Sequence, residues 1–150
     1  MDGAVDWRII GHETEAGKDV EIISVYPTVQ GPYVAMKVWW STQDFPEGET
    51  GFFTERDVQG KDEKLLLAYW KSEGGRTRAT GLDPNIIHIL KVLEEKIFNR
   101  KTNPTKKLRV QFVGHSAEKK DTRWWPAEEV EKAYVEVYEE WTFKKEKLDN

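Results

Sequence analysis

The chain has 150 residues, a formal net charge of −4 and no cysteine, and its aromatic residues comprise seven Trp, five Tyr and six Phe. This length suits one ordinary domain or two small ones, and the aromatic content excludes a largely disordered chain. The lack of cysteine excludes a disulfide framework and a cysteine nucleophile, and it favours a reducing intracellular compartment. No apolar run approaches the ~20 residues that cross a bilayer, so we expect a soluble protein.

The charge is distributed unevenly along the chain. Residues 1–75 carry 7 basic and 14 acidic side chains, whereas residues 76–150 carry 16 basic and 13 acidic ones. An acidic chain is a poor general binder of polyanions, so any nucleic-acid contact is expected where basic residues gather. Residues 96–117 contain no acidic residue and six basic ones, which are Lys96, Arg100, Lys101, Lys106, Lys107 and Arg109.

The first half predicts three strands and a helix. Residues 18–26 are rich in β-branched side chains, and residues 33–40 alternate between two faces. Turn residues between these segments favour a hairpin, and residues 51–54 predict a third, short strand. A helix is expected from Asp62, which can cap its N-terminus, to Trp70.

The second half repeats this order of elements. An apolar strand is expected over 86–98, a second strand over 108–112, and a helix that begins at Pro126. In that helix four apolar residues recur at helical spacing, which predicts one buried stripe. The stripe consists of Val130, Tyr134, Val137 and Trp141.

The stretch between the halves, residues 72–81, is rich in glycine, lacks large apolar side chains and is interpreted as a linker. The sequence therefore predicts an α+β protein, mainly β with C-terminal helices, made of two small modules. Each module is expected to be a curved, antiparallel three-stranded sheet packed by a helix. The expected boundaries are residues 5–73 and 84–145, with the linker at 74–83.

Three segments of the second half carry a family resemblance: 89–94, 108–115 and 124–130, the last beginning Trp-Trp-Pro-Ala-Glu-Glu. Over roughly residues 86–143 the chain resembles a chromodomain, and its closing segment 137–143 is similar to the end of the chromo shadow helix. In the first half the segments 9–11, 19–26 and 53–69 look like the same superfamily, with an additional strand at 33–40.

The resemblance implies a nuclear, chromatin-associated binding protein without a cofactor. Chromodomains hold a histone tail as an added β-strand, and three aromatic residues cage a methylated lysine through cation–π attraction. In the second module the three cage positions fall on Ile87, Phe112 and His115, of which only Phe112 is a six-membered aromatic ring. Trp124 matches the structural Trp of the family and is expected in the core.

The first half offers more aromatic residues for a peptide or methyl-lysine site. Its candidates are Trp7, Tyr26, Trp39 and Trp40, which lie on or beside the predicted strands. Trp39 and Trp40 are adjacent in a strand and must face opposite sides, so one of them needs a cover or a ligand. We expect Trp39 to be the exposed one; packing under the 45–50 loop or against the second module is the alternative. Glu47 and Glu49 are suited to a lysine-rich tail.

Two other binding functions remain open. In a scaffold of the chromo shadow type, the last helix would pair with a partner or a second copy through Tyr138, Trp141 and Phe143, although Tyr138 and Phe143 could equally pack on the first module. Such a scaffold would act in a heterochromatin or silencing complex without binding methyl-lysine. Alternatively, the basic loop at 96–109 would bind nucleic acid.

Catalysis is not expected. His12, His88 and His115 lack the spacing of metal ligands, and no phosphate-binding loop or nucleophile elbow is present. His88 lies between two isoleucines in a predicted strand and is expected to point outward as a polar residue.

Overall fold

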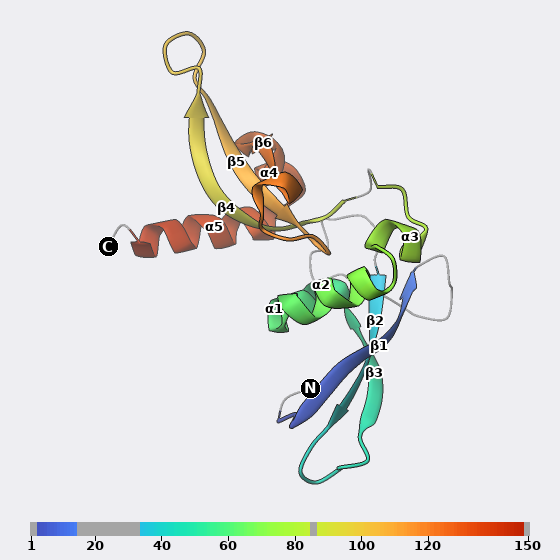
Figure 1. Ribbon diagram of the computed structural model, residues 1–150. Helices are drawn as coiled ribbons and strands as arrows, with labels where there is room; N and C mark the ends of the chain where they lie inside the picture. Colours follow the sequence, from blue (N-terminus) through green and yellow to red (C-terminus); the bar gives the residue numbers. More distant parts are fainter. Residues whose placement is uncertain (1–2, 15–33, 85–86, 149–150) are drawn as a thin grey trace. The chain divides into compact units, whose positions relative to one another are not determined.

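The computed structural model describes residues 3–14, 34–84 and 87–148, which form two compact units (Figure 1). The first unit comprises the described residues up to 84, and the second comprises residues 87–148. Each unit contains one antiparallel three-stranded sheet together with helices, so the predicted α+β class is confirmed at this level. None of the helices in the described part of the chain has the length and apolar character needed to cross a membrane.

In the first unit the strands follow one another in space as they do in the chain, in the order β1-β2-β3, and we call them sheet A. The predicted strands at 33–40 and 51–54 and the predicted helix at 62–70 correspond to β2, β3 and α2. Asp62 caps α2 as expected, because its side chain accepts a hydrogen bond from the backbone N–H of Leu65. The elements are β1 (Asp6–Thr14), β2 (Val34–Ser41), β3 (Glu49–Thr54), α1 (Glu55–Lys61), α2 (Glu63–Ser72) and α3 (Arg76–Thr80).

Strand β1, which pairs with β2, was not predicted, and the predicted strand at 18–26 lies outside the described residues. Strand β1 was missed because it contains a β-bulge, where the register shifts between Ile9 and Gly11. Ile9 and His12 both face the core, opposite Val38 and Met36, although they are three residues apart. The bulge breaks the period-2 pattern by which a strand is recognised in a sequence.

The bulge places His12 at the junction of three elements. Its Nε2 donates to the carbonyl of Ala79 in α3 at 3.1 Å, and its Nδ1 lies 2.6 Å from the Tyr69 hydroxyl in α2. The imidazole also meets the Trp70 ring edge-on, with the centroids 4.9 Å apart. Burial raises the pKa of Tyr69 to about 12, and Glu73 adds to the effect, so this phenol stays a neutral partner for the imidazole.

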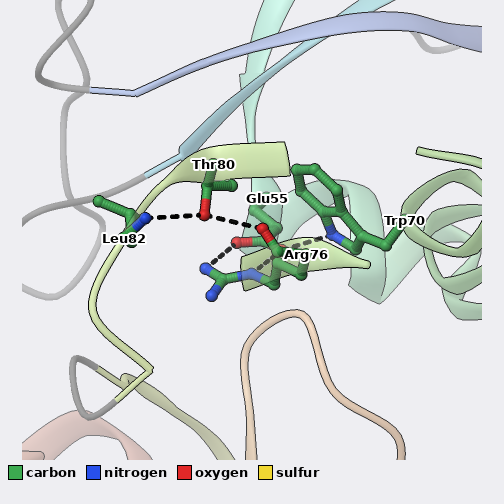
Figure 2. Close-up of polar contacts among 5 residues, drawn as sticks. All are labelled: Glu55, Trp70, Arg76, Thr80 and Leu82. Carbon is green, nitrogen blue, oxygen red and sulfur yellow. Dashed lines mark hydrogen bonds and ion pairs between the residues drawn. The ribbon is translucent and has the colours of Figure 1, made fainter. Parts of the chain in front are cut away.

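A buried ion pair holds α3 on the first unit (Figure 2). The Glu55 carboxylate accepts hydrogen bonds from the Arg76 Nε and terminal nitrogen at 2.8 and 2.7 Å, and from the Trp70 indole at 2.8 Å. Thr80 then accepts from the Leu82 N–H, and Leu82 packs against the core. The 74–83 segment, predicted as a linker, is therefore helical and packed in part, because Arg76 pairs with Glu55 and because Ala79 and Leu82 pack against the core.

The second unit contains sheet B, in the order β4-β5-β6, two α-helices and the short 3₁₀ helix η2 (Lys119–Asp121). Both predicted strands are present, but the predicted helix from Pro126 is interrupted at Tyr134, whose backbone leaves the helical region. Val130, Tyr134 and Val137 of the predicted stripe are buried as expected. The elements are β4 (Ile89–Phe98), β5 (Thr105–Phe112), β6 (Arg123–Pro126), α4 (Ala127–Ala133) and α5 (Val135–Leu148).

Two predictions for the second unit were wrong. Trp125, opposite the buried Leu108, faces the core and meets Tyr134, whereas Trp124 is opposite Arg109 on the other face; both indoles are half-buried. His88 is 8% exposed and lies just before β4. His88 lies before the first residue of β4 and not inside the strand. The alternation of side-chain directions along a strand therefore does not apply to it.

Candidate functional site

The face of sheet A that points away from the core carries the candidate site. On β2 the residues Val34, Met36 and Val38 belong to the core, so Lys37 and Trp39 lie on the opposite face. Across the sheet Trp39 is flanked by Arg8 and Thr50, and Lys37 by Gly11 and Phe52. We call this surface the outer face of sheet A. Its residues are Arg8, Gly11, Lys37, Trp39, Thr50 and Phe52.

Trp39 is held between an arginine and a loop. The Arg8 guanidinium lies over the indole at 4.5 Å from the ring centroid. Gly48 has a φ of +84°, and a Cβ at this position would lie 2.3 Å from the Trp39 Nε1, so only glycine permits this close approach. Trp39 faces away from the core but is half-buried, so the expectation of an exposed Trp39 was wrong and the alternative, in which it packs against the 45–50 loop, agrees with the structure.

Two further rings, one on β3 and one in the β2–β3 loop, are exposed. Phe52 is 44% exposed and has the Lys37 ammonium 5.9 Å from its centroid, and Phe45 is 52% exposed in the loop between β2 and β3. The turn that presents Phe45 is closed by its backbone N–H, which bonds to the Thr42 hydroxyl at 3.1 Å. The same loop carries exposed carboxylates at Asp44 and Glu47, whereas the exposed Glu49, the first residue of β3, is opposite Trp40 and lies on the other face. The loop that adjoins the outer face therefore adds an apolar ring and negative charge.

The predicted aromatic site of the first module is divided between two faces. Trp7 and Trp40 pair across β1 and β2 and pack against the core, where Trp40 meets Phe53 at 5.6 Å, whereas Trp39 is on the outer face. The three indoles thus do not converge, because β-strand alternation and pairing put the other two on the core side. Tyr26 lies outside the described residues.

The predicted cage of the second module is closed. Phe112 is 3% exposed and packs on Trp125, with the centroids 6.1 Å apart. His115 is half-buried, donates its backbone N–H to the Phe112 carbonyl at 3.1 Å and accepts from Gln111 at 3.0 Å through its own carbonyl. Assigning Phe112 to a ligand site was therefore wrong, because the ring is part of the core.

Of the three predicted partner residues in α5, one is tied to its own sheet. Trp141 donates from its indole to Glu95 of β4 at 2.9 Å, and the Lys145 ammonium contacts the same carboxylate oxygen at 2.9 Å. Burial alone would raise the pKa of Glu95, but these two hydrogen bonds and the charges of Lys106 and Lys145 outweigh it and lower the pKa.

The other two partner residues are accessible. Phe143 is 59% exposed, and the Lys147 ammonium lies 4.7 Å from its ring centroid. Tyr138 lines a shallow hollow of about 510 Å³ between the β4–β5 hairpin and α4. The remaining lining residues are Asn103, Pro104, Thr105, Lys106, Pro126, Ala127, Glu128 and Glu131.

The six basic residues of the predicted nucleic-acid site are not equivalent. Arg109 is engaged within the unit, with Glu94 at 2.6 Å, the Thr122 hydroxyl at 3.1 Å and the Ala117 carbonyl at 3.3 Å. Lys106 is on the α5 side of sheet B, 4.0 Å from Glu95. Of the other four, Lys96, Arg100 and Lys101 are exposed and Lys107 is half-buried.

Sequence reasoning did not single out Arg8, Lys37, Phe45 or Phe52. The adjacent Phe52 and Phe53 were a usable signal, because two neighbours in a strand cannot both face the core. The described residues contain no group of three or more His, Asp or Glu side chains placed to hold a metal ion. Comparisons of the chain with protein-family models, with curated proteins and with solved structures found no match.

Proposed function

We propose that the protein is a non-enzymatic, chromo-like binding module of the nucleus that holds an extended, lysine-rich peptide, such as a histone tail, at the outer face of sheet A. The observation that carries the proposal is the combination of Trp39, Phe45 and Phe52 with exposed carboxylates at one end of this sheet. Rings supply apolar and cation–π contacts to lysine side chains, and carboxylates supply opposite charge.

Strand addition is the mode of binding that fits this sheet. Among the described strands β1 and β3 each pair with β2 alone, so each presents an edge. An extended peptide that pairs with β3 places alternate side chains on the outer face, where Phe52 lies, while main-chain hydrogen bonds supply affinity independent of sequence.

Recognition of a methylated lysine at Trp39 requires that the peptide cation replace the Arg8 guanidinium, which already lies over the ring. A methylated ammonium sheds its hydration more readily than an unmodified one, so it competes better for a ring face. The proposed order of affinity is therefore trimethylated above unmodified peptide, and Arg8→Ala should widen the difference.

Titration calorimetry with unmodified and trimethylated histone-tail peptides tests the proposal. Phe45→Ala and Phe52→Ala remove exposed rings and should each weaken binding by about tenfold without changing the thermal unfolding midpoint. Trp39→Ala should also weaken binding. Phe143→Ala, an exposed phenylalanine of the second unit, is the matched control. Binding that is absent, or unaffected by all three first-unit variants, would overturn the proposal.

A second candidate is a scaffold of the chromo shadow type that pairs through α5. It is favoured by the exposed Phe143 and by Tyr138 at the rim of a hollow. Light scattering at increasing concentration tests it: a dimer that Phe143→Ala converts to monomer supports pairing, and a monomer at all concentrations rejects it.

A further inference from the structure

We propose that sheet B carries a binding surface for single-stranded nucleic acid on the face opposite α5. The surface, which we call the Phe98 platform, consists of Phe98 and Trp124 with the flanking Lys96 and Lys107. It is a function of the second unit and is separate from the peptide site proposed for sheet A.

The rings of the platform lie in contact, and two cations lie over one of them, Phe98. Phe98 and Trp124 meet edge-to-face, with centroids 5.4 Å apart and planes at 74°. The ammonium groups of Lys96 and Lys107 lie 5.5 and 5.1 Å from the Phe98 centroid. Both rings are half-buried, so each keeps part of its surface for a ligand.

The two lysines of the platform repel each other electrostatically. Lys96 and Lys107 are directly opposite each other in the β4–β5 register, an arrangement in which like charges repel. Within the part of the chain that the structure describes, neither forms an ion pair with a carboxylate. The nearby acids are engaged elsewhere, Glu94 with Arg109 and Glu95 with Lys106 and Lys145. An anionic ligand would relieve this repulsion.

The positive charge continues beyond the platform. The hairpin loop adds the exposed Arg100 and Lys101, and the sequence from 96 to 117 contains no acidic residue. A line of cations along the hairpin matches the repeated phosphates of a nucleic-acid strand, and the rings between them offer stacking surfaces for bases. Bases expose their faces only when unpaired, so the rings favour a single strand over a duplex. An acidic peptide would use the lysines but leave the rings without a role.

Fluorescence anisotropy with labelled oligo(U) and oligo(dT) tests this proposal on the full chain. Binding should weaken with salt between about 50 and 200 mM, with a log–log slope of roughly −0.7 for each phosphate neutralised. The double variant Lys96→Gln/Lys107→Gln should reduce the magnitude of that slope by roughly 1.4. Phe98→Leu keeps an apolar side chain but removes the ring, so it should weaken binding by about tenfold and leave the slope unchanged.

The second unit offers a control at Lys132, an exposed lysine of α4. Lys132→Gln should bind as the wild type does. The proposal is overturned if no oligonucleotide binds at about 50 mM salt, if duplex binds as tightly as single strand, or if polyglutamate competes equally. If Phe45→Ala loses peptide binding but still binds the oligonucleotide, the Phe98 platform and the peptide site on sheet A are independent sites.

Discussion

At the scale of single residues, the first unit depends on polar groups that are buried and fully engaged. The Glu55 side chain is 3% exposed and that of Arg76 13%, and the carboxylate accepts from both the guanidinium and the Trp70 indole. Removing one charge from such a pair leaves the other in a medium that solvates it poorly. Replacing both partners by apolar residues avoids that penalty.

Arg76→Ala is therefore expected to lower the free energy of unfolding by about 3–5 kcal/mol, because Glu55 stays buried without its cation. Denaturant unfolding measures the change. Arg78→Ala, at an exposed position of the same helix, should change stability by less than about 0.5 kcal/mol. The double variant Glu55→Met/Arg76→Met should be more stable than Arg76→Ala alone. Equal losses would mean that the unpaired Glu55 charge is not the cause of the destabilisation.

Glu95 links the stability of the second unit to pH. Its pKa in the folded protein is below the ordinary value, so its interactions stabilise the fold above the unfolded-state pKa of about 4.3 and are lost as pH falls through the lower folded value. Glu95→Gln should cost about 1 kcal/mol at pH 7 and progressively less in acid. Unfolding curves at pH 7 and at about pH 3 give this difference, with the exposed Glu139→Gln as control. A pH-independent cost would contradict the linkage.

At the scale of elements, short irregularities decide which side chains meet. The bulge in β1 turns His12 inward, and the Gly48 backbone closes over Trp39. Neither feature adds an apolar side chain, yet each fixes the direction of a functional group. The loop before β3 is thus part of the candidate site and not only a connection.

Gly48→Ala should destabilise the protein by about 1–3 kcal/mol, because the residue has a positive φ and its new methyl group would clash with the indole. It should also shift the Trp39 indole N–H resonance in NMR spectra. Gly60→Ala in α1 meets nothing within 4 Å and should instead stabilise by about 0.5–1 kcal/mol. If both alanines had the same effect, the close approach of the loop would not matter energetically.

At the scale of the whole molecule, two small units each carry a sheet and helices of their own. The second unit buries its own core, which includes Leu108, Val110, Phe112, Val130 and Val137. Compact units with separate cores generally fold independently. The opposite charge balance of the two halves assigns a basic peptide to the first unit and a polyanion to the second in our proposals.

A fragment of residues 82–150 should therefore fold by itself. We expect a single cooperative thermal transition, an α+β circular dichroism spectrum and retained near-ultraviolet signals from its tryptophans. The variant Val130→Asp, which places a charge in the core, is the unfolded control. A fragment that shows helical signals without a cooperative transition would mean that the second unit needs residues from the first.

The expected predominance of β-structure was wrong, because helix and strand are about equally represented. The amino-acid sequence alone was enough to predict the α+β class, strands β2, β3, β4 and β5, and three of the four residues of the buried stripe. These features follow from local periodicity and capping, which act between neighbours in the chain. Asp62 as a cap and the outward direction of Trp39 are predictions of this kind, and both agree with the structure.

The tertiary structure alone decided which rings lie together and which polar groups are buried. Phe112 belongs to the core, Trp124 joins Phe98 on the opposite face, and α3 packs through Arg76. Each of these depends on cross-strand register or on a contact between residues far apart in the chain, and a one-residue bulge reverses the faces. Local sequence patterns indicate that a side chain requires a packing or hydrogen-bond partner, but the identity of that partner depends on the tertiary fold.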